Sequence, residues 1–199
     1  MIEAALNRRS VRAWMRRVIR PAVLVFALTG AVALPGETDN PPPEIEVKAA
    51  FVLNFVRFVY WTNLPEEENT ADLRICALAN SDFADAVRRV AAGKMAGKRS
   101  ISLRFEPTPT PSRCRVLILD AGDYRIAAPA LSAVRNAPVL TIGNGPGLIP
   151  MGGMFELIVR DRKVQFDINL DAIHKANLDV SSRLLELSRN LKTAANRSH

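Results

Sequence analysis

Gly-Gly-Met-Phe-Glu-Leu-Ile-Val-Arg-Asp-Arg-Lys-Val-Gln-Phe-Asp-Ile-Asn, residues 152–169, is the stretch that decides the fold. Apolar side chains occupy alternate positions on both sides of a charged turn at 161–163, namely Phe155, Leu157, Val159, Val164, Phe166 and Ile168. Alternation with a period of two around a short polar turn predicts a β-hairpin with one buried face. Because an isolated hairpin is barely stable in water, the rest of the chain must extend it and cover that face.

Residues 1–33 have the features of an export signal. Six arginines oppose one glutamate in residues 1–20, and an apolar run from Pro21 to Ala33 follows. This run is shorter than the roughly 20 residues that cross a bilayer, and it ends in the small-x-small pattern Ala31-Val32-Ala33. We therefore predict a secretory signal cleaved after Ala33. The alternative is an uncleaved membrane anchor.

Removal of the signal changes the charge balance of the chain. Six of the 27 basic residues and one of the 20 acidic residues lie in 1–33, which leaves 21 against 19. A nearly neutral protein lacks the positive field that binds nucleic acid, so we expect no nucleic-acid partner. The remaining length suits one domain, which can bury roughly two-thirds of its unfolded surface without the help of disulfides.

The two cysteines, Cys76 and Cys114, can be interpreted in two ways. An exported protein meets an oxidising compartment, which favours a bridge between them. Two buried thiols that act as small apolar side chains are the alternative. Cys76 falls in the middle of a predicted strand and Cys114 at the start of another, and the register of adjacent strands could hold them apart. The pattern leaves both interpretations open.

The first predicted element is an unusually apolar helix. Residues 34–43 contain too many prolines for a packed element and predict an extended linker. From Glu44 onward, apolar residues recur at spacings of three and four as far as Trp61, which predicts a helix. Its aromatic residues exceed what one buried face can hide, so we predict that some of them bind a partner protein, namely Phe51, Phe55, Phe58 and Trp61.

Strand and helix patterns then alternate along the chain. Strands are predicted at 73–79, 100–106, 116–119 and 139–142, with helices at 83–92 and 124–136 and an amphipathic helix at 181–191. Such alternation predicts right-handed crossover units and a parallel sheet. The predicted fold class is therefore α/β: a three-layer mixed sheet, mostly parallel with a C-terminal antiparallel hairpin, and helices on both faces. The domain should span 44–193 and leave 194–199 as a disordered tail.

No catalytic or metal-binding set can be assembled from the sequence. The two histidines are His174 and the tail residue His199, and neither has a cysteine or acidic cluster beside it. The glycine-rich loop 143–153 opens a strand rather than a helix, so it lacks the context of a phosphate cradle. We expect a protein that is not an enzyme and that carries no cofactor. The loop nevertheless follows the carboxyl end of a strand, where open parallel sheets bind ligands.

Polar residues in apolar surroundings are the remaining candidates for a site. Arg57 in the first helix, Asn169 at the end of the hairpin and Arg183 in the last helix all need partners if they are buried. Leaving such a group unpaired costs about 1–3 kcal/mol. They can form an internal hydrogen-bond network, or they can bind a small ligand.

Several segments together resemble one known family. They are Lys-Ala-Ala-Phe-Val-Leu-Asn-Phe-Val-Arg-Phe-Val-Tyr-Trp (48–61), the strand that holds Cys76, Pro-Val-Leu-Thr-Ile (138–142), Gly-Gly-Met (152–154), Phe-Asp-Ile-Asn-Leu (166–170) and Ser-Ser-Arg-Leu-Leu (181–185). In this order they are similar to the YfiR family of exported bacterial proteins, formerly a domain of unknown function (DUF4154). The resemblance covers most of Glu46–Leu191.

The resemblance implies a mixed α/β domain that acts without chemistry. It also implies a periplasmic repressor that binds the sensing domain of an inner-membrane diguanylate cyclase, lowers cyclic-di-GMP and so affects biofilm formation, and that commonly forms a homodimer. The alternative hypothesis is a periplasmic protein that binds a small molecule or cell-wall fragment near Gly143–Gly153 and acts with another membrane sensor.

Overall fold

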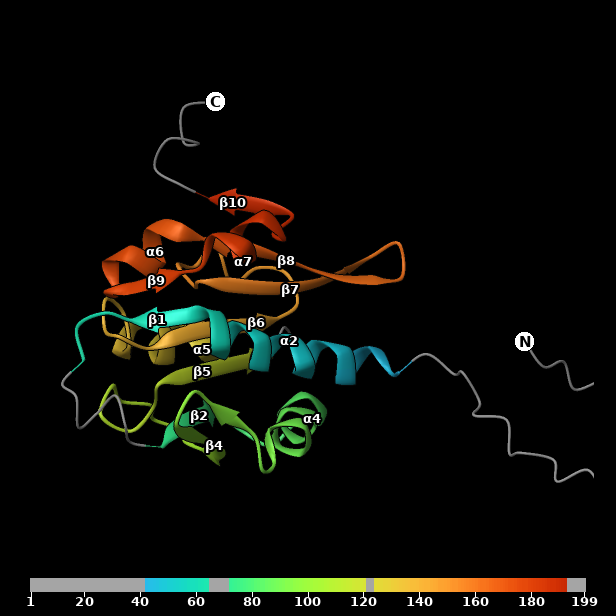
Figure 1. Cartoon of the computed structure of the whole chain (residues 1–199). Coiled ribbons are helices and arrows are strands. Elements are labelled where there is room, and N and C mark those ends of the chain that lie inside the picture. Colours follow the sequence, from blue (N-terminus) through green and yellow to red (C-terminus); the bar gives the residue numbers. More distant parts are fainter. Residues whose placement is uncertain (1–41, 65–71, 121–123, 193–199) are drawn as a thin grey trace, which may run out of the picture. The chain divides into compact units, whose positions relative to one another are not determined.

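The predicted hairpin is present and lies within a larger sheet. In the computed structural model, β7 (Phe155–Arg160) and β8 (Lys163–Asn169) pair antiparallel, from Phe155 opposite Ile168 to Arg160 opposite Lys163 (Figure 1). The turn residues Asp161 and Arg162 have φ angles of 53° and 59°. Two successive left-handed residues match the twist of the flanking strands, which is why such turns close tight hairpins.

The structure describes residues 42–64, 72–120 and 124–192, all of which belong to one of two units, Pro41–His199. The predicted signal at 1–33, nearly all of the predicted linker at 34–43 and the predicted tail at 194–199 lie outside the described residues. No described helix is both long enough and apolar enough to cross a membrane.

An eight-stranded mixed sheet forms the centre of the fold, in the order β10-β8-β7-β6-β5-β2-β4-β3. The five strands from β4 to β7 in that order run parallel, whereas β8 is antiparallel to β7 and β3 to β4. The α/β fold class is therefore confirmed. The remaining strands are β2 (Leu73–Ala77), β3 (Met95–Ala96), β4 (Arg99–Phe105), β5 (Val116–Asp120), β6 (Leu140–Asn144) and β10 (Asn190–Lys192).

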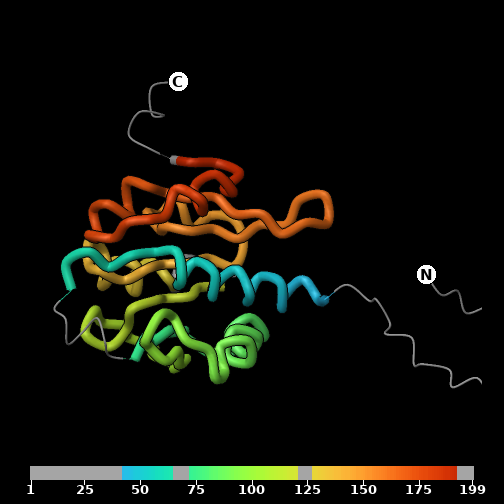
Figure 2. The backbone as a smooth tube through the Cα atoms, viewed as in Figure 1, coloured from blue at the N-terminus to red at the C-terminus, as the bar shows by residue number. Residues whose placement is uncertain are grey.

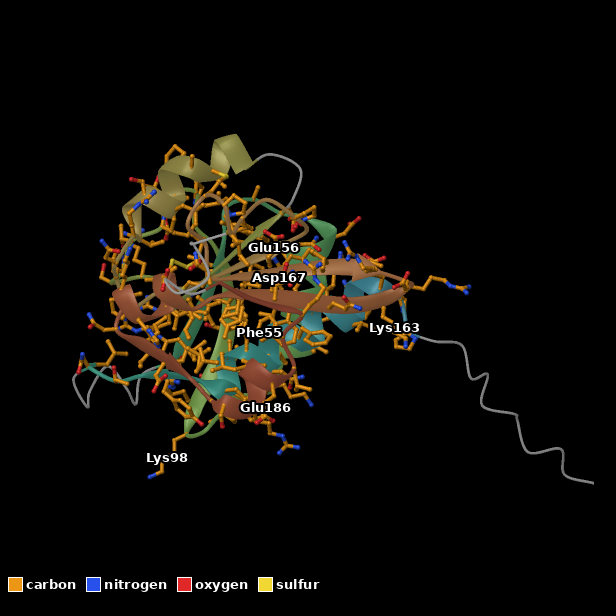
Figure 3. All side chains as sticks on the ribbon, turned by 90° about the horizontal axis from the view of Figure 1, so that it is seen from above. Phe55, Lys98, Glu156, Lys163, Asp167 and Glu186 are labelled. Atoms are coloured by element: carbon orange, nitrogen blue, oxygen red, sulfur yellow. A yellow bond between two sulfur atoms is a disulfide. The ribbon has the colours of Figure 1, made fainter. Side chains whose placement is uncertain are left out.

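Two apolar cores lie on the two faces of the sheet. Along β5, Val116 and Ile118 point into the core under helices α2 (Glu44–Phe58) and α4 (Asp82–Ala91), whereas Leu117 and Leu119 point into the core under α5 (Tyr124–Ala133). Burial on both faces explains why β5 is a continuous apolar run without alternation. Viewed from above, the sheet separates α5 from α2 (Figure 3).

The first helix is shorter than predicted. Glu44 and Glu46 lie in the first turn of α2, where negative charge is stabilised by the free backbone amides. The helix ends at Phe58 because the backbone becomes extended at Val59, and residues 59–61 form β1 (Val59–Trp61). This strand pairs antiparallel with β9 (Leu178–Val180), so the N-terminal helix and the C-terminal region run side by side (Figure 2).

The C-terminal region also differs from the prediction of one helix at 181–191. Helix α6 (Leu170–Lys175) follows the hairpin directly, and α7 (Ser182–Glu186) is a helix of five residues. Beyond α7 the chain enters β10, which pairs parallel with β8 and so displaces the hairpin from the edge of the sheet. Arg189 stabilises this arrangement by forming two hydrogen bonds to the buried carboxylate of Asp167.

A disulfide joins Cys76 of β2 to Cys114, which precedes β5. The two Cα atoms are 5.7 Å apart, well inside the range that a bridge requires. Register does not separate them, because β2 and β5 are hydrogen-bonded neighbours and Cys114 lies two residues before β5 begins. The bridge is buried in the core beneath α5.

Candidate functional site

The outward stripe of α2 is a candidate interaction surface. Its exposed residues beyond the first turn are Ala50, Asn54 and Arg57, with the half-buried Val47 on the same side, and Glu44 is exposed in the first turn. The exposed positions of α4 are by contrast Asp82, Arg88 and Arg89, all charged. From Val47 to Arg57, the solvent-facing stripe of α2 therefore bears a single charge, fewer than the exposed positions of α4.

The structure separates the four predicted partner-binding aromatics into two groups. Phe55 and Trp61 are 0% and 6% exposed, so the prediction that they bind a partner is wrong for both. Phe55 stacks on Phe155 with ring centroids 4.5 Å apart and also contacts Phe166 at 5.0 Å. Phe51 and Phe58 are only partly buried, so part of each ring remains accessible.

Trp61 connects parts of the core that are distant in sequence. Its indole N–H donates to the carbonyl of Pro138, 77 residues away, at 2.9 Å, and the guanidinium of Arg99 lies 4.9 Å above its ring. Burial, and then the positive charge of Arg115, lowers the pKa of Arg99 below its ordinary value. Cation–π contact with the indole partly replaces the water that Arg99 has lost.

Tyr60 is an exposed aromatic that the sequence prediction missed. It is 52% exposed between the buried residues Val59 and Trp61, as strand geometry requires. The prediction placed these residues in a helix, and the period-two pattern of β1 is too short to show in the sequence. Tyr60 extends the candidate surface from α2 onto β1, so the name "α2 surface" is used below for Ala50, Asn54, Arg57 and Tyr60 with the half-buried Phe51 and Phe58.

The predicted ligand-binding residues Arg57, Asn169 and Arg183 do not form a joint network among the described residues. Asn169 is buried, and its side-chain oxygen accepts the Ala172 amide at 3.2 Å, which caps α6. Arg57 lies on the exposed face of α2 and Arg183 on the exposed side of α7. Asn169 is therefore a structural cap, and the predicted site at these three residues is not formed.

Two buried carboxylates lie directly opposite each other on β7 and β8, where Figure 3 shows them side by side. Glu156 accepts the amides of Gly147 and Ile149 at 2.8 and 3.0 Å and so holds the 145–153 loop against the sheet. Asp167 binds Arg189. Because both carboxylates are engaged in these contacts, the pair serves the fold and is not arranged for acid–base catalysis.

A cavity of about 540 Å³ lies on the α5 side of the sheet, at the amino-terminal end of β6. Its walls come from the end of α5, the 151–154 segment and α6, and Thr141 of β6 lines its base. Met151 and Gly152 of the glycine-rich loop line this cavity, but it lies at the amino-terminal end of β6 and not at the carboxyl end where the sequence suggested a ligand. The described residues contain no cluster of histidine, cysteine and carboxylate side chains suited to a metal ion.

Comparisons with known proteins place this geometry in a family. A solved structure titled as a conserved domain protein from Vibrio cholerae O1 biovar El Tor strain N16961 is similar in fold, with a TM-score of 0.50 at 8% sequence identity. The match covers 75% of this chain and 60% of that chain, so this chain spans about three-fifths of its length. The family model DUF4154, described as YfiR/HmsC-like, matches residues 45–189. That match takes in nearly all of the described structure, and the chain belongs to the YfiR/HmsC-like family.

Proposed function

We propose that this protein is a non-catalytic periplasmic regulator that binds the periplasmic sensing domain of an inner-membrane diguanylate cyclase and represses it. The YfiR-like family is known for periplasmic regulators of such cyclases and is generally regulatory rather than catalytic. The predicted export signal at 1–33 supports the periplasmic location. Repression would act through contact alone, by holding the sensing domain in a conformation that keeps the cyclase inactive.

The composition of the α2 surface is the observation that carries the proposal. Ala50 and Asn54 have short side chains and no charge, so a partner helix can approach α2 closely at these two positions, with Arg57 the one charge on this surface. Phe51, Phe58 and Tyr60 supply accessible aromatic area around them, and aromatic residues contribute most of the binding energy at typical interfaces. The spacing of 50, 54 and 57 matches helix-in-groove recognition.

A charge placed on the α2 surface provides the test. Ala50→Arg introduces a long cation at an exposed position and leaves the core beneath it untouched. Ala128→Arg is the matched control, since Ala128 is an exposed alanine of α5, on the other side of the sheet. Each variant is expressed in a strain that lacks the gene, and cellular cyclic-di-GMP is measured together with binding to the purified sensing domain of the cyclase.

We expect deletion to raise cyclic-di-GMP, Ala128→Arg to restore the low level and Ala50→Arg to fail. Truncating or blocking a central interface position typically weakens binding by 2 kcal/mol or more, or about 30-fold. Unchanged cyclic-di-GMP on deletion would refute repression of a cyclase. Full activity of Ala50→Arg would refute the α2 surface as the contact. Light scattering on the same preparations tests the homodimer that the family resemblance implies, and cell fractionation tests the periplasmic location.

A further inference from the structure

The cavity beside α5 has features that the regulatory proposal does not use. Its volume of about 540 Å³ falls within the range of roughly 300–1,000 Å³ that holds small organic ligands. Leu131 of α5, Val134 just after it, and Met151 and Met154 of the loop give it an apolar lining. A ligand that fills it must therefore present an apolar body to these four side chains.

The two charged residues that line the cavity are both cations, and its other polar side chains, Asn136 and Thr141, are neutral. Arg135 follows α5, and Lys175 ends α6, so the two cations come from different elements, on either side of the same space. The lining contains no carboxylate, and neither cation forms an ion pair with any described residue. A guanidinium nitrogen of Arg135 lies close to the loop, 3.8 Å from the position that a Cβ on Gly152 would occupy.

A cation near the end of a helix also stabilises the helix dipole, and this is the competing explanation for Arg135 and Lys175. Dipole stabilisation accounts for the positions of the two residues in sequence, but it does not account for Thr141. This threonine is 3% exposed, and its hydroxyl oxygen accepts the Met154 amide at 3.0 Å. Among the described residues the hydroxyl makes no further hydrogen bond, so its proton remains available to an acceptor in the cavity.

We propose that this cavity binds a small organic anion whose carboxylate or phosphate group is held by Arg135 and Lys175, while its apolar body packs on the methionine and leucine side chains. Thr141 donates to an oxygen of the ligand at the base of the cavity. Both cations and the hydroxyl are donors, so the ligand group that satisfies them is an acceptor with negative charge. Arg135 and Lys175 are exposed and stay hydrated beside a neutral analogue, so such an analogue lacks the charge-assisted hydrogen bonds of the anion and binds more weakly.

The cavity shares no residue with the α2 surface. The anion proposal is therefore independent of the proposed regulation of a cyclase. Failure of one experiment leaves the other unaffected, because the variants Arg135→Gln and Lys175→Gln do not alter the α2 surface.

Binding is measured by isothermal titration and by NMR chemical-shift changes on the mature chain, with three anionic probes: 4-phenylbutyrate, octanoate and phenyl phosphate. Phenylbutyrate and octanoate test two kinds of apolar body, and phenyl phosphate tests the alternative head group. The alcohol 4-phenylbutan-1-ol is the neutral analogue. Arg160→Gln is the control variant, since Arg160 is an exposed cation at the far end of β7 and outside the cavity.

We expect at least one anion to bind with a dissociation constant of about 1 mM or below and to shift the amides of 151–154 and α6. Arg135→Gln and Lys175→Gln should each weaken that binding about tenfold or more, whereas Lys175→Arg and Arg160→Gln should retain it. The alcohol should bind more weakly by a similar factor. Absence of binding by all three anions at about 10 mM, equal binding of the alcohol, or equal weakening by Arg160→Gln would overturn the proposal.

Discussion

Replacement of Phe55 distinguishes a core residue from a docking residue. The side chain is 0% exposed, and its ring contacts three others, those of Phe51, Phe155 and Phe166, at centroid distances of 5.9, 4.5 and 5.0 Å. A buried Phe→Ala change costs about 3–5 kcal/mol, through lost burial and the cavity that remains. Each aromatic pair adds about 0.5–1.5 kcal/mol, so we expect the loss for Phe55→Ala to lie above the lower limit of the 3–5 kcal/mol range, at about 4 kcal/mol.

Urea denaturation of the chain without the predicted signal measures this change, because the buried Trp61 reports unfolding by its fluorescence. Domains of this size unfold with about 5–15 kcal/mol, so the variant should remain mostly folded at 25 °C and can still be tested for partner binding. Asn54→Ala, on the exposed face of the same helix, is the matched control and should change stability by less than about 0.5 kcal/mol.

Two results would refute this reasoning. A stability loss below about 1 kcal/mol for Phe55→Ala would mean that the aromatic cluster relaxes around the deletion or is not packed as described. If Phe55→Ala keeps its stability but no longer binds the partner, Phe55 contacts the partner directly, as the sequence predicted.

Three further outcomes follow from contacts described above. The double variant Cys76→Ala/Cys114→Ala removes a bridge with a sequence separation of 38 residues. Because the bridge restricts the unfolded chain, its removal should lower the free energy of unfolding by about 4 kcal/mol. A reductant should cause the same loss in the parent chain and no loss in the double variant. Glu156→Ala should lower the free energy of unfolding by about 1–3 kcal/mol. It should also speed hydrogen exchange at the two loop amides that donate to this carboxylate, and unchanged exchange would contradict its role in holding the loop. Trp61→Phe keeps a ring but deletes the donor to the Pro138 carbonyl and should cost about 1 kcal/mol in urea; a neutral result would show that water satisfies that carbonyl equally well.

The central part of the fold could be predicted from the sequence because its patterns are local. The hairpin alternates around a charged turn, and β5 is a continuous apolar run because both of its faces are covered. The C-terminal region could not be predicted in this way. Leucines at helical spacing in 181–191 suggested one helix, but pairing with β8 and the contact between Arg189 and Asp167 favour an extended strand after α7.

The candidate sites were predicted less well, for two physical reasons. Periodicity marks residues of α2 as apolar, but it does not show which of them face the sheet, so Phe55 was assigned to the surface and Tyr60 was missed. The proposed anion-binding cavity depends on Arg135 and Lys175, which are far apart in sequence and line the same cavity because α6 follows β8. No local pattern contains that information.

The pairing of β1 with β9 has a consequence for how the chain acquires its structure. Thr62 donates to the carbonyl of Asn177, 115 residues later, and the segment between them contains most of the sheet. Synthesis delivers the N-terminus first, so α2 and its aromatic residues are made well before their final neighbours. Contacts between segments so distant in sequence form slowly, and an apolar helix that lacks its neighbours is prone to aggregate. Protection by a chaperone should therefore matter most until β9 and the residues after it have been made.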